Sequence, residues 1–101
     1  MINVLATIEL KPGTREEFLQ HFNDNVPAVL GEVGCIEYFP SVDFDSGLEV
    51  QSSNPNSVTV IEKWESLAAL TDHLRAPHMA EYKEKVKDMV VDLSLKVLQR
   101  A

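Results

Sequence analysis

Cysteine, basic residues and long apolar runs are all scarce in this sequence of 101 residues. The single cysteine, Cys35, excludes an intrachain disulfide and fits the reducing cytoplasm, where we expect the protein to reside. Nine Lys and Arg stand against 16 Asp and Glu, and this net charge of -7 argues against nucleic-acid binding, which needs clustered positive charge. No segment approaches the roughly 20 apolar residues of a membrane span, and the first residues read as a strand rather than a signal peptide.

The rest of the composition is that of an ordinary globular protein. The chain is 45% hydrophobic and 25% charged, and its length suits one domain over residues 1–101. A chain this short buries a limited fraction of its surface, so a partner subunit would add useful burial.

Alternation of apolar and polar residues predicts four strands. They cover residues 2–10, 35–43, 57–65 and 92–99. Residues 44–56 are rich in Ser, Asn, Asp, Gly and Pro, which is typical of an extended hairpin connection between the second and third strands.

Helical spacing and capping residues predict the remaining elements. Thr14 and Glu17 have the spacing of a capping box, which would begin a helix that closes at Gly31. Ser66 can cap a second, short helix. Pro77 breaks that helix and suits the first position of a third.

The element order is β-α-β-β-α-β, with the second helical segment in two parts, and this order predicts an α+β fold of the ferredoxin-like kind. Helices would cover one face of the antiparallel sheet. The other face would expose apolar side chains, namely Leu5, Ile36, Tyr38, Val42, Ile61 and Leu98. An uncovered apolar face indicates a partner, and a second copy packed sheet to sheet is the simplest one.

A specific run of residues ends the third strand and continues into the helical segments after it. Val60-Ile61-Glu62-Lys63-Trp64-Glu65-Ser66 is followed by Ala69-Leu70, His73-Leu74 and Ala76-Pro77-His78-Met79. This pattern resembles the antibiotic-biosynthesis-monooxygenase domain of the quinol monooxygenase kind. The resemblance implies a dimeric α/β barrel with a pocket between helices and sheet, where O₂ oxidises phenols or quinols without metal or flavin.

Two positions depart from particular branches of that family. Ala6 stands where haem-degrading relatives place an Asn, and Val60 stands where polyketide-oxidising relatives place one. We therefore expect no haem and, more generally, no cofactor.

Glu62 is the first candidate catalytic residue. Strict alternation places it on the same strand face as Trp64, so a carboxylate would lie among apolar groups, where it could act as a general base or serve as a structural hydrogen-bond partner. Trp64 would then be either a core aromatic or a pocket wall that donates its indole N–H. Glu37 would share this face if strand pairing is regular, whereas a bulge would turn it outward.

Two histidines flank the helix break at Pro77 and complete the candidate catalytic set. His73 lies in the last turn of the short helix and His78 in the first turn of the next, where a neutral imidazole could bind a phenol or move its proton. They could also ligate a metal, but no third ligand has a suitable spacing, so we expect no metal site. The remaining candidate substrate contacts are apolar or aromatic: Phe22, Leu70, Met79 and Tyr82.

The sequence therefore predicts a cofactor-independent monooxygenase that acts on a small phenolic or quinol-type aromatic with O₂. Two alternatives remain open from the sequence. One is a non-oxidative isomerase or hydrolase of a small oxygenated metabolite. The other is a non-catalytic dimeric module that binds a ligand.

Overall fold

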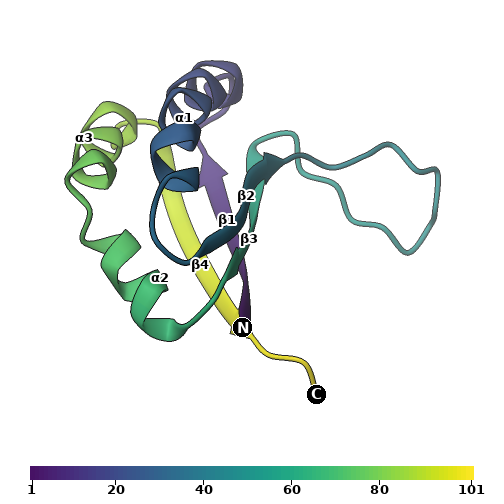
Figure 1. The fold of residues 1–101 in the computed structure, drawn as a ribbon. Coiled ribbons are helices and arrows are strands. Elements are labelled where there is room, and N and C mark those ends of the chain that lie inside the picture. Colours follow the sequence, from purple (N-terminus) through teal and green to yellow (C-terminus); the bar gives the residue numbers. More distant parts are fainter.

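The computed structural model describes residues 1–101 and confirms the predicted α+β, ferredoxin-like architecture. Four antiparallel strands form one sheet in the order β2-β3-β1-β4, and the helices lie together on one of its faces (Figure 1). The elements are β1 Ile2–Leu10, α1 Arg15–Leu30, β2 Cys35–Ser41, β3 Ser57–Trp64, α2 Leu67–Leu74, α3 Pro77–Val86 and β4 Val90–Leu98. None of these helices is long and apolar enough to cross a membrane.

The core lies between the helices and the two central strands. Alternate residues of β1 and β3 point toward the helices, because side chains alternate between the faces of a sheet. Their buried members are Val4, Ala6, Ile8 and Leu10 on β1 and Val58, Val60, Glu62 and Trp64 on β3. Phe18 and Phe22 of α1 pack against this layer.

The predicted helix caps are partly confirmed. The Ser66 side chain accepts a hydrogen bond from the Ala69 backbone N–H at the start of α2, and Pro77 is the first residue of α3. The capping box predicted at Thr14 and Glu17 is wrong, because the Thr14 hydroxyl donates to the Lys11 carbonyl and makes no cap to α1.

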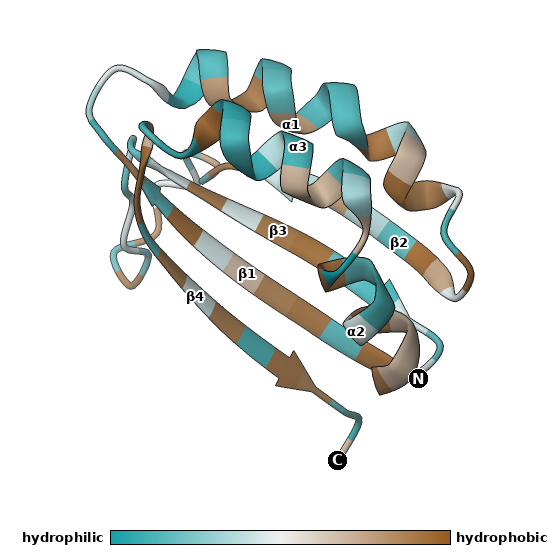
Figure 2. Ribbon diagram, turned by 90° about the vertical axis from the view of Figure 1, so that its left-hand side faces the viewer, coloured by the Kyte–Doolittle hydropathy of each residue, from teal (hydrophilic) through white to brown (hydrophobic).

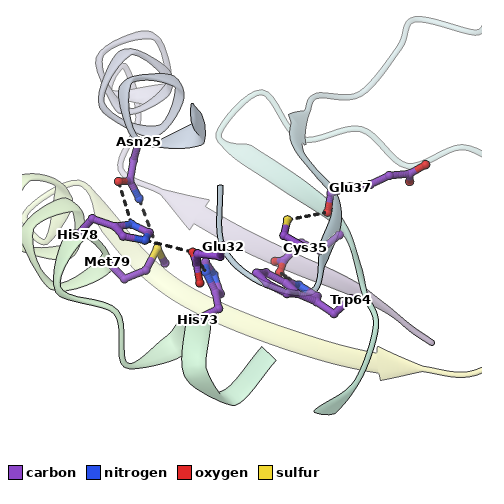
Figure 3. A network of polar contacts seen from close by, with 9 residues as sticks. Asn25, Glu32, Cys35, Glu37, Trp64, His73, His78 and Met79 are labelled. Carbon is purple, nitrogen blue, oxygen red and sulfur yellow. Dashed lines mark hydrogen bonds and ion pairs between the residues drawn. The ribbon is translucent and has the colours of Figure 1, made fainter. Parts of the chain in front are cut away.

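A bulge in β2 corrects two predictions about side-chain direction. The register with β3 shifts between Cys35 and Glu37, so Tyr38 lies opposite Glu62. Tyr38 is consequently buried on the helix side, not on the uncovered face where the alternation pattern placed it. Glu37 lies opposite Lys63 and is exposed, with its side chain pointing away from the polar network (Figure 3).

Strand β4 is an edge strand that the helices do not cover (Figure 2). Leu93 and Leu95 lie opposite Ile8 and Ala6, so they face the helix side, yet they are 56% and 45% exposed. The opposite face of the sheet carries an apolar patch made of Leu5, Phe39, Ile61 and Leu98. No helix covers this patch (Figure 1).

Residues 42–56 form an extended connection between β2 and β3, which we call the arm. It projects from the sheet on the side opposite the helices (Figure 1). It contains three acidic residues and exposes the apolar side chains of Phe44, Leu48 and Val50.

Candidate functional site

A mostly apolar cavity of about 390 Å³ lies between the sheet, α1, α2 and α3. The sheet contributes Ala6, Ile8, Val60, Leu93 and Leu95; the helices contribute Phe22, Leu74, Met79, Tyr82 and Val86. Four residues with polar groups complete the inner lining: Tyr38, Glu62, His73 and the hydroxyl of Tyr82. A volume of this size suits a small organic ligand.

Glu62 is a buried carboxyl group in the wall of this cavity. Its Oε1 accepts a hydrogen bond from the indole Nε1–H of Trp64 over 2.9 Å. Burial raises the pKa of Glu62 above its usual 4.5, the Trp64 hydrogen bond opposes this rise, and the charge of Glu32 adds to it. The raised pKa brings proton uptake by Glu62 nearer to neutral pH.

His73 is almost wholly buried on the opposite wall, and its Nδ1 lies 2.9 Å from Oε2 of Glu32. Burial lowers the pKa of His73 below its usual 6.5, although the hydrogen bond and charge of Glu32 act in the other direction. The lowered pKa favours the neutral imidazole of His73 at pH 7. A neutral imidazole that donates Nδ1–H to a carboxylate carries its lone pair on Nε2.

Four polar atoms of the lining have no partner within the protein. They are Oε2 of Glu62, Nε2 of His73 and the hydroxyls of Tyr38 and Tyr82. Every fully buried side-chain nitrogen or oxygen has a hydrogen-bond partner, so each of these atoms must reach open space. All four residues line the cavity, which is therefore the open space that a ligand near these atoms would occupy.

The two tyrosines remain neutral phenols. Burial, reinforced by the nearby charge of Glu62, raises the pKa of both Tyr38 and Tyr82 far above the neutral range. Their rings pack with Phe22, since Tyr38 stacks on it at 5.4 Å and Tyr82 meets it edge-on at 5.7 Å between centroids. Each hydroxyl can therefore donate a hydrogen bond to an oxygen atom of a bound ligand.

Glu32 links both histidines to the loop after α1 (Figure 3). Its Oε2 lies 2.9 Å from His73 Nδ1 and 3.1 Å from His78 Nε2, and His78 Nδ1 lies 3.1 Å from Asn25 Oδ1. His78 does not line the cavity. The structure therefore brings His73 to the cavity and places His78 behind Glu32, where it supports the network.

Some of the other predicted site residues line the cavity, and the rest lie outside it. Phe22, Met79 and Tyr82 line the cavity, whereas Leu70 is buried elsewhere in the core. Trp64 lies behind the cavity wall, where it holds Glu62 and packs against the His73 ring at 4.7 Å between centroids. Glu37 is outside the site because the β2 bulge turns it outward.

Sequence reasoning missed two residues of the inner site. Tyr38 was assigned to the wrong face because the β2 bulge leaves no clear mark in the sequence. Glu32 lies in the loop after α1, where no periodic pattern assigns a direction to its side chain. The only available signal was a lone acid between Gly31 and Gly34, in a loop that must pass close to the sheet.

The cavity mouth has a different character from its interior. Lys83 and Lys87 lie there beside the exposed side chains of Leu74, Leu93 and Leu95. Lys87 pairs with Glu84 at 2.7 Å, whereas Lys83 has no ion-pair partner. No group of three or more His, Cys, Asp or Glu side chains that could hold a metal ion occurs in the protein.

Comparison with known families agrees with this fold. Residues 1–85 match the model of the antibiotic biosynthesis monooxygenase family, and the chain belongs to that family. A relative from Escherichia coli K12, the probable quinol monooxygenase YgiN, is 44% identical over 101 residues, which cover 98% of this chain and 97% of YgiN. The uncharacterized protein sll1783 of Synechocystis is 30% identical over 88% of this chain and 55% of its own length.

Solved structures share the fold at low sequence identity. A conserved protein from Methanosarcina mazei Go1 superposes with a TM-score of 0.83 at 23% identity, over 99% of this chain and 92% of that protein. A crystal structure of an antibiotic biosynthesis monooxygenase superposes with a TM-score of 0.83 at 22% identity, over 100% and 99% of the two chains.

Proposed function

We propose that this protein is a cofactor-independent monooxygenase that uses O₂ to oxidise a phenolic or quinol-type small molecule in the cavity. Membership of the family and the 44% identity to a probable quinol monooxygenase support this reaction class. The apolar walls, the aromatic rings of Phe22, Tyr38 and Tyr82, and the volume of about 390 Å³ support a small aromatic substrate.

The observation that carries the proposal is the pairing of Glu32 with His73. A carboxylate that accepts Nδ1–H directs the lone pair of Nε2 toward the cavity and would stabilise the imidazolium that forms when Nε2 takes a proton. Glu62, with its raised pKa and its free Oε2, supplies a second proton acceptor in the same cavity. An apolar cavity with two such groups is suited to a substrate that must lose protons.

The first step in this account is removal of a phenolic proton by Nε2 of His73. The resulting phenolate has carbanion character at the ring carbon ortho to its oxygen, and it is electron-rich enough to reduce O₂. Electron transfer from the phenolate gives a substrate radical and superoxide. Their combination forms a C–O bond, and the proton from His73 completes a hydroperoxide on that carbon.

The second step breaks the O–O bond. Glu62 removes the remaining proton from the oxygenated carbon, a carbonyl forms there, and hydroxide leaves and takes the proton back from Glu62 as water. In total, one quinol and one O₂ give one hydroxyquinone and one water. The substrate supplies all four electrons, so the protein contributes position, desolvation and proton transfer.

The tyrosines have a separate role in this account. The hydroxyls of Tyr38 and Tyr82 reach the cavity and stay protonated, so they can donate hydrogen bonds to substrate oxygens as negative charge develops. The apolar walls limit water near the reactive radical pair.

We also propose that two copies pack through the uncovered faces of their sheets. The patch of Leu5, Phe39, Ile61 and Leu98 supports this arrangement, because apolar side chains on a sheet face gain free energy when a second sheet removes them from water. Two-fold packing would oppose each patch to itself, which is the commonest arrangement of homo-oligomers.

Oxygen consumption tests the reaction. Purified protein is mixed with a hydroquinone, and O₂ uptake and quinone absorbance are recorded against spontaneous oxidation without protein. We expect one O₂ consumed per hydroxyquinone formed, and a loss of about 10²–10⁴-fold in turnover for His73→Gln and for Glu62→Gln.

His21→Gln on α1 is the matched control, because His21 does not line the cavity. It should retain the activity of the unaltered protein. Turnover of a phenol without O₂ uptake would indicate isomerase or hydrolase chemistry, and quinol binding without turnover would indicate a binding module; either result would overturn the oxidative proposal.

A further inference from the structure

All residues of the arm, 42–56, are exposed except Gln51 and Asn56, which are half-buried. Its backbone is held by internal hydrogen bonds, such as Gln51 Nε2 to the Phe44 carbonyl at 2.8 Å and the Asn54 amide to Asp43 Oδ2 at 2.7 Å. Phe44 and Val50 are nevertheless 80% and 95% exposed. A segment with internal hydrogen bonds that displays large apolar side chains has the properties of a contact surface.

The direction of the arm indicates which molecule it meets. The arm projects beyond the sheet face that lacks helices, on the side opposite α1, α2 and α3 (Figure 1). The apolar patch that we propose as the dimer interface lies on this same face. A second copy packed there would therefore lie beside the arm.

The arm is long enough to pass the sheet of that second copy. Facing sheets pack about 10 Å apart. Half of the arm is about seven residues, and an extended chain spans at most roughly 3.3 Å per residue, so the tip can reach about 20 Å from its base. The tip can thus reach the helix side of the partner's sheet.

The direction of the two-fold axis and the strand order together decide which edge of the partner the arm passes. The arm follows β2 at one edge of the sheet, and β4 forms the other edge. A two-fold axis parallel to the strands, lying between the two sheets, places β2 of one protomer against β4 of its partner. The cavity opens along β4 and α3, where Leu74, Leu93 and Leu95 are exposed.

Charge and apolar character match across this junction. The arm carries Asp43, Asp45 and Glu49 and no Lys, Arg or His. The cavity mouth carries Lys83, which has no ion-pair partner, and Lys87, in a chain with only nine basic residues. The cavity rim is apolar like the exposed side chains of the arm, so the two surfaces would be complementary in both respects if they met.

We infer that the arm of one protomer closes the cavity mouth of its partner, so that each site is completed by the second copy. This inference rests on the proposed sheet-to-sheet dimer and is independent of the reaction assigned to the cavity. It makes the arm part of the ligand site in trans, with Phe44, Leu48 and Val50 as its apolar contacts.

Intermolecular paramagnetic broadening tests the inference directly. One batch of protein carries ¹³C-labelled Leu methyl groups. The other carries no isotope and a nitroxide at Ser52→Cys, on the arm, in a Cys35→Ala background. In mixed dimers the nitroxide and the observed methyls belong to different chains, so broadening of Leu93 and Leu95 reports only the partner's arm. We expect those signals to broaden and to recover when the nitroxide is reduced.

A nitroxide at Glu16→Cys, in the first turn of α1, is the matched control and should leave the Leu93 and Leu95 signals sharp. Sedimentation of the same samples gives the oligomeric state. Dimers with no broadening from the arm would overturn the inference alone. Stable monomers would overturn both the inference and the proposed dimer, while the oxygen chemistry would stay open to its own test.

Discussion

The indole N–H of Trp64 donates a hydrogen bond to Oε1 of Glu62 over 2.9 Å, so the aromatic residue tunes the carboxyl group from behind the cavity wall. This bond lowers the pKa of Glu62 and partly offsets the rise caused by burial. The relationship explains why a tryptophan two residues after the acid on the same strand face belongs to the site without lining it.

Trp64→Phe should raise the pKa of Glu62 further. Phenylalanine keeps an aromatic ring in the core but removes the donor that favours the ionised carboxylate. The titration of Glu62, followed by the ¹³C shift of its side-chain carboxyl, should move to higher pH. Loss of the bond and of part of the ring should also cost about 1–3 kcal/mol of unfolding free energy. An unchanged titration would show that the hydrogen bond from Trp64 does not affect the pKa of Glu62.

Glu32→Gln should reduce turnover by about 10²-fold or more, because the amide keeps the shape of the carboxylate but cannot stabilise an imidazolium at His73. The pH–rate profile should also shift, which loss of packing alone would not cause. His78→Gln is the matched comparison, since it removes the other contact of Glu32 and leaves the cavity lining intact. Equal losses in both variants would contradict a special role for the pair of Glu32 and His73.

Burial of Glu62 should make stability fall as pH rises above 4.5. Its pKa is raised in the folded state, so the folded protein binds more protons than the unfolded chain between 4.5 and the folded pKa. Stability is therefore lost across that window and stays lower above it. Glu62→Gln lacks this loss. The free energy of unfolding of the variant minus that of the unaltered protein should therefore be larger at pH 8 than at pH 4. Urea unfolding at fixed protein concentration measures the difference.

His73 should make stability rise with pH below pH 6.5. Its pKa is lowered from 6.5, so the unfolded chain binds more protons between the folded pKa and 6.5, and stability rises with pH through that window. His73→Gln should flatten this part of the curve. A profile with the same slope in the variant and the unaltered protein would contradict the assignment.

Gly34→Ala should destabilise the fold. Gly34 has φ of +86°, and an added Cβ would lie 2.6 Å from Cβ of Ala69. The strained backbone and the collision should cost about 1–3 kcal/mol of unfolding free energy. Gly31→Ala is the control, because its Cβ would meet only ordinary contacts at 3.5 Å or more and no positive φ is required. Similar thermal midpoints for both variants would contradict this reading of the turn before β2.

Ile61→Lys should weaken the proposed dimer. Ile61 lies on the central strand β3 in the uncovered apolar patch, and a lysine there would be buried without a partner on association. We expect the dimer dissociation constant, measured by sedimentation, to rise by about tenfold or more, the effect of roughly 1.4 kcal/mol. Glu17→Lys on α1, which is exposed and far from the uncovered sheet face, is the control and should leave the dissociation constant unchanged. A stable monomer before substitution would contradict the dimer itself.

The sequence predicted the fold and half of the site because those parts follow local rules. Strand alternation correctly placed Glu62 and Trp64 on the helix side, and helical spacing brought Phe22, Met79 and Tyr82 to the same layer. The position of Tyr38 could not be predicted in this way, because one extra residue at the bulge reverses every later side chain of the strand. Glu32 could not be placed either, since a loop has no period that assigns a face to its side chains.

Tertiary packing, which the sequence pattern does not reveal, also separates the two histidines. Both flank the break at Pro77, and both contact Glu32. Only the tertiary packing of α2 against β3 turns His73 onto the Trp64 ring and into the cavity wall, while His78 turns toward Asn25 on α1. Proximity along the chain therefore correctly predicted that both histidines join one polar network. It could not predict that only His73 lines the cavity.

Isotope labelling with ¹⁸O₂ shows whether an oxygen atom of O₂ enters the product, as the proposed monooxygenase reaction requires. Metal-free protein is given a hydroquinone under ¹⁸O₂, and the quinone product and the water are examined by mass spectrometry. We expect one ¹⁸O atom in each hydroxyquinone, the second ¹⁸O atom in water, and loss of both signals in the double variant His73→Gln, Glu62→Gln. Quinone that carries no ¹⁸O, with hydrogen peroxide as the reduced product, would contradict the proposed monooxygenase reaction.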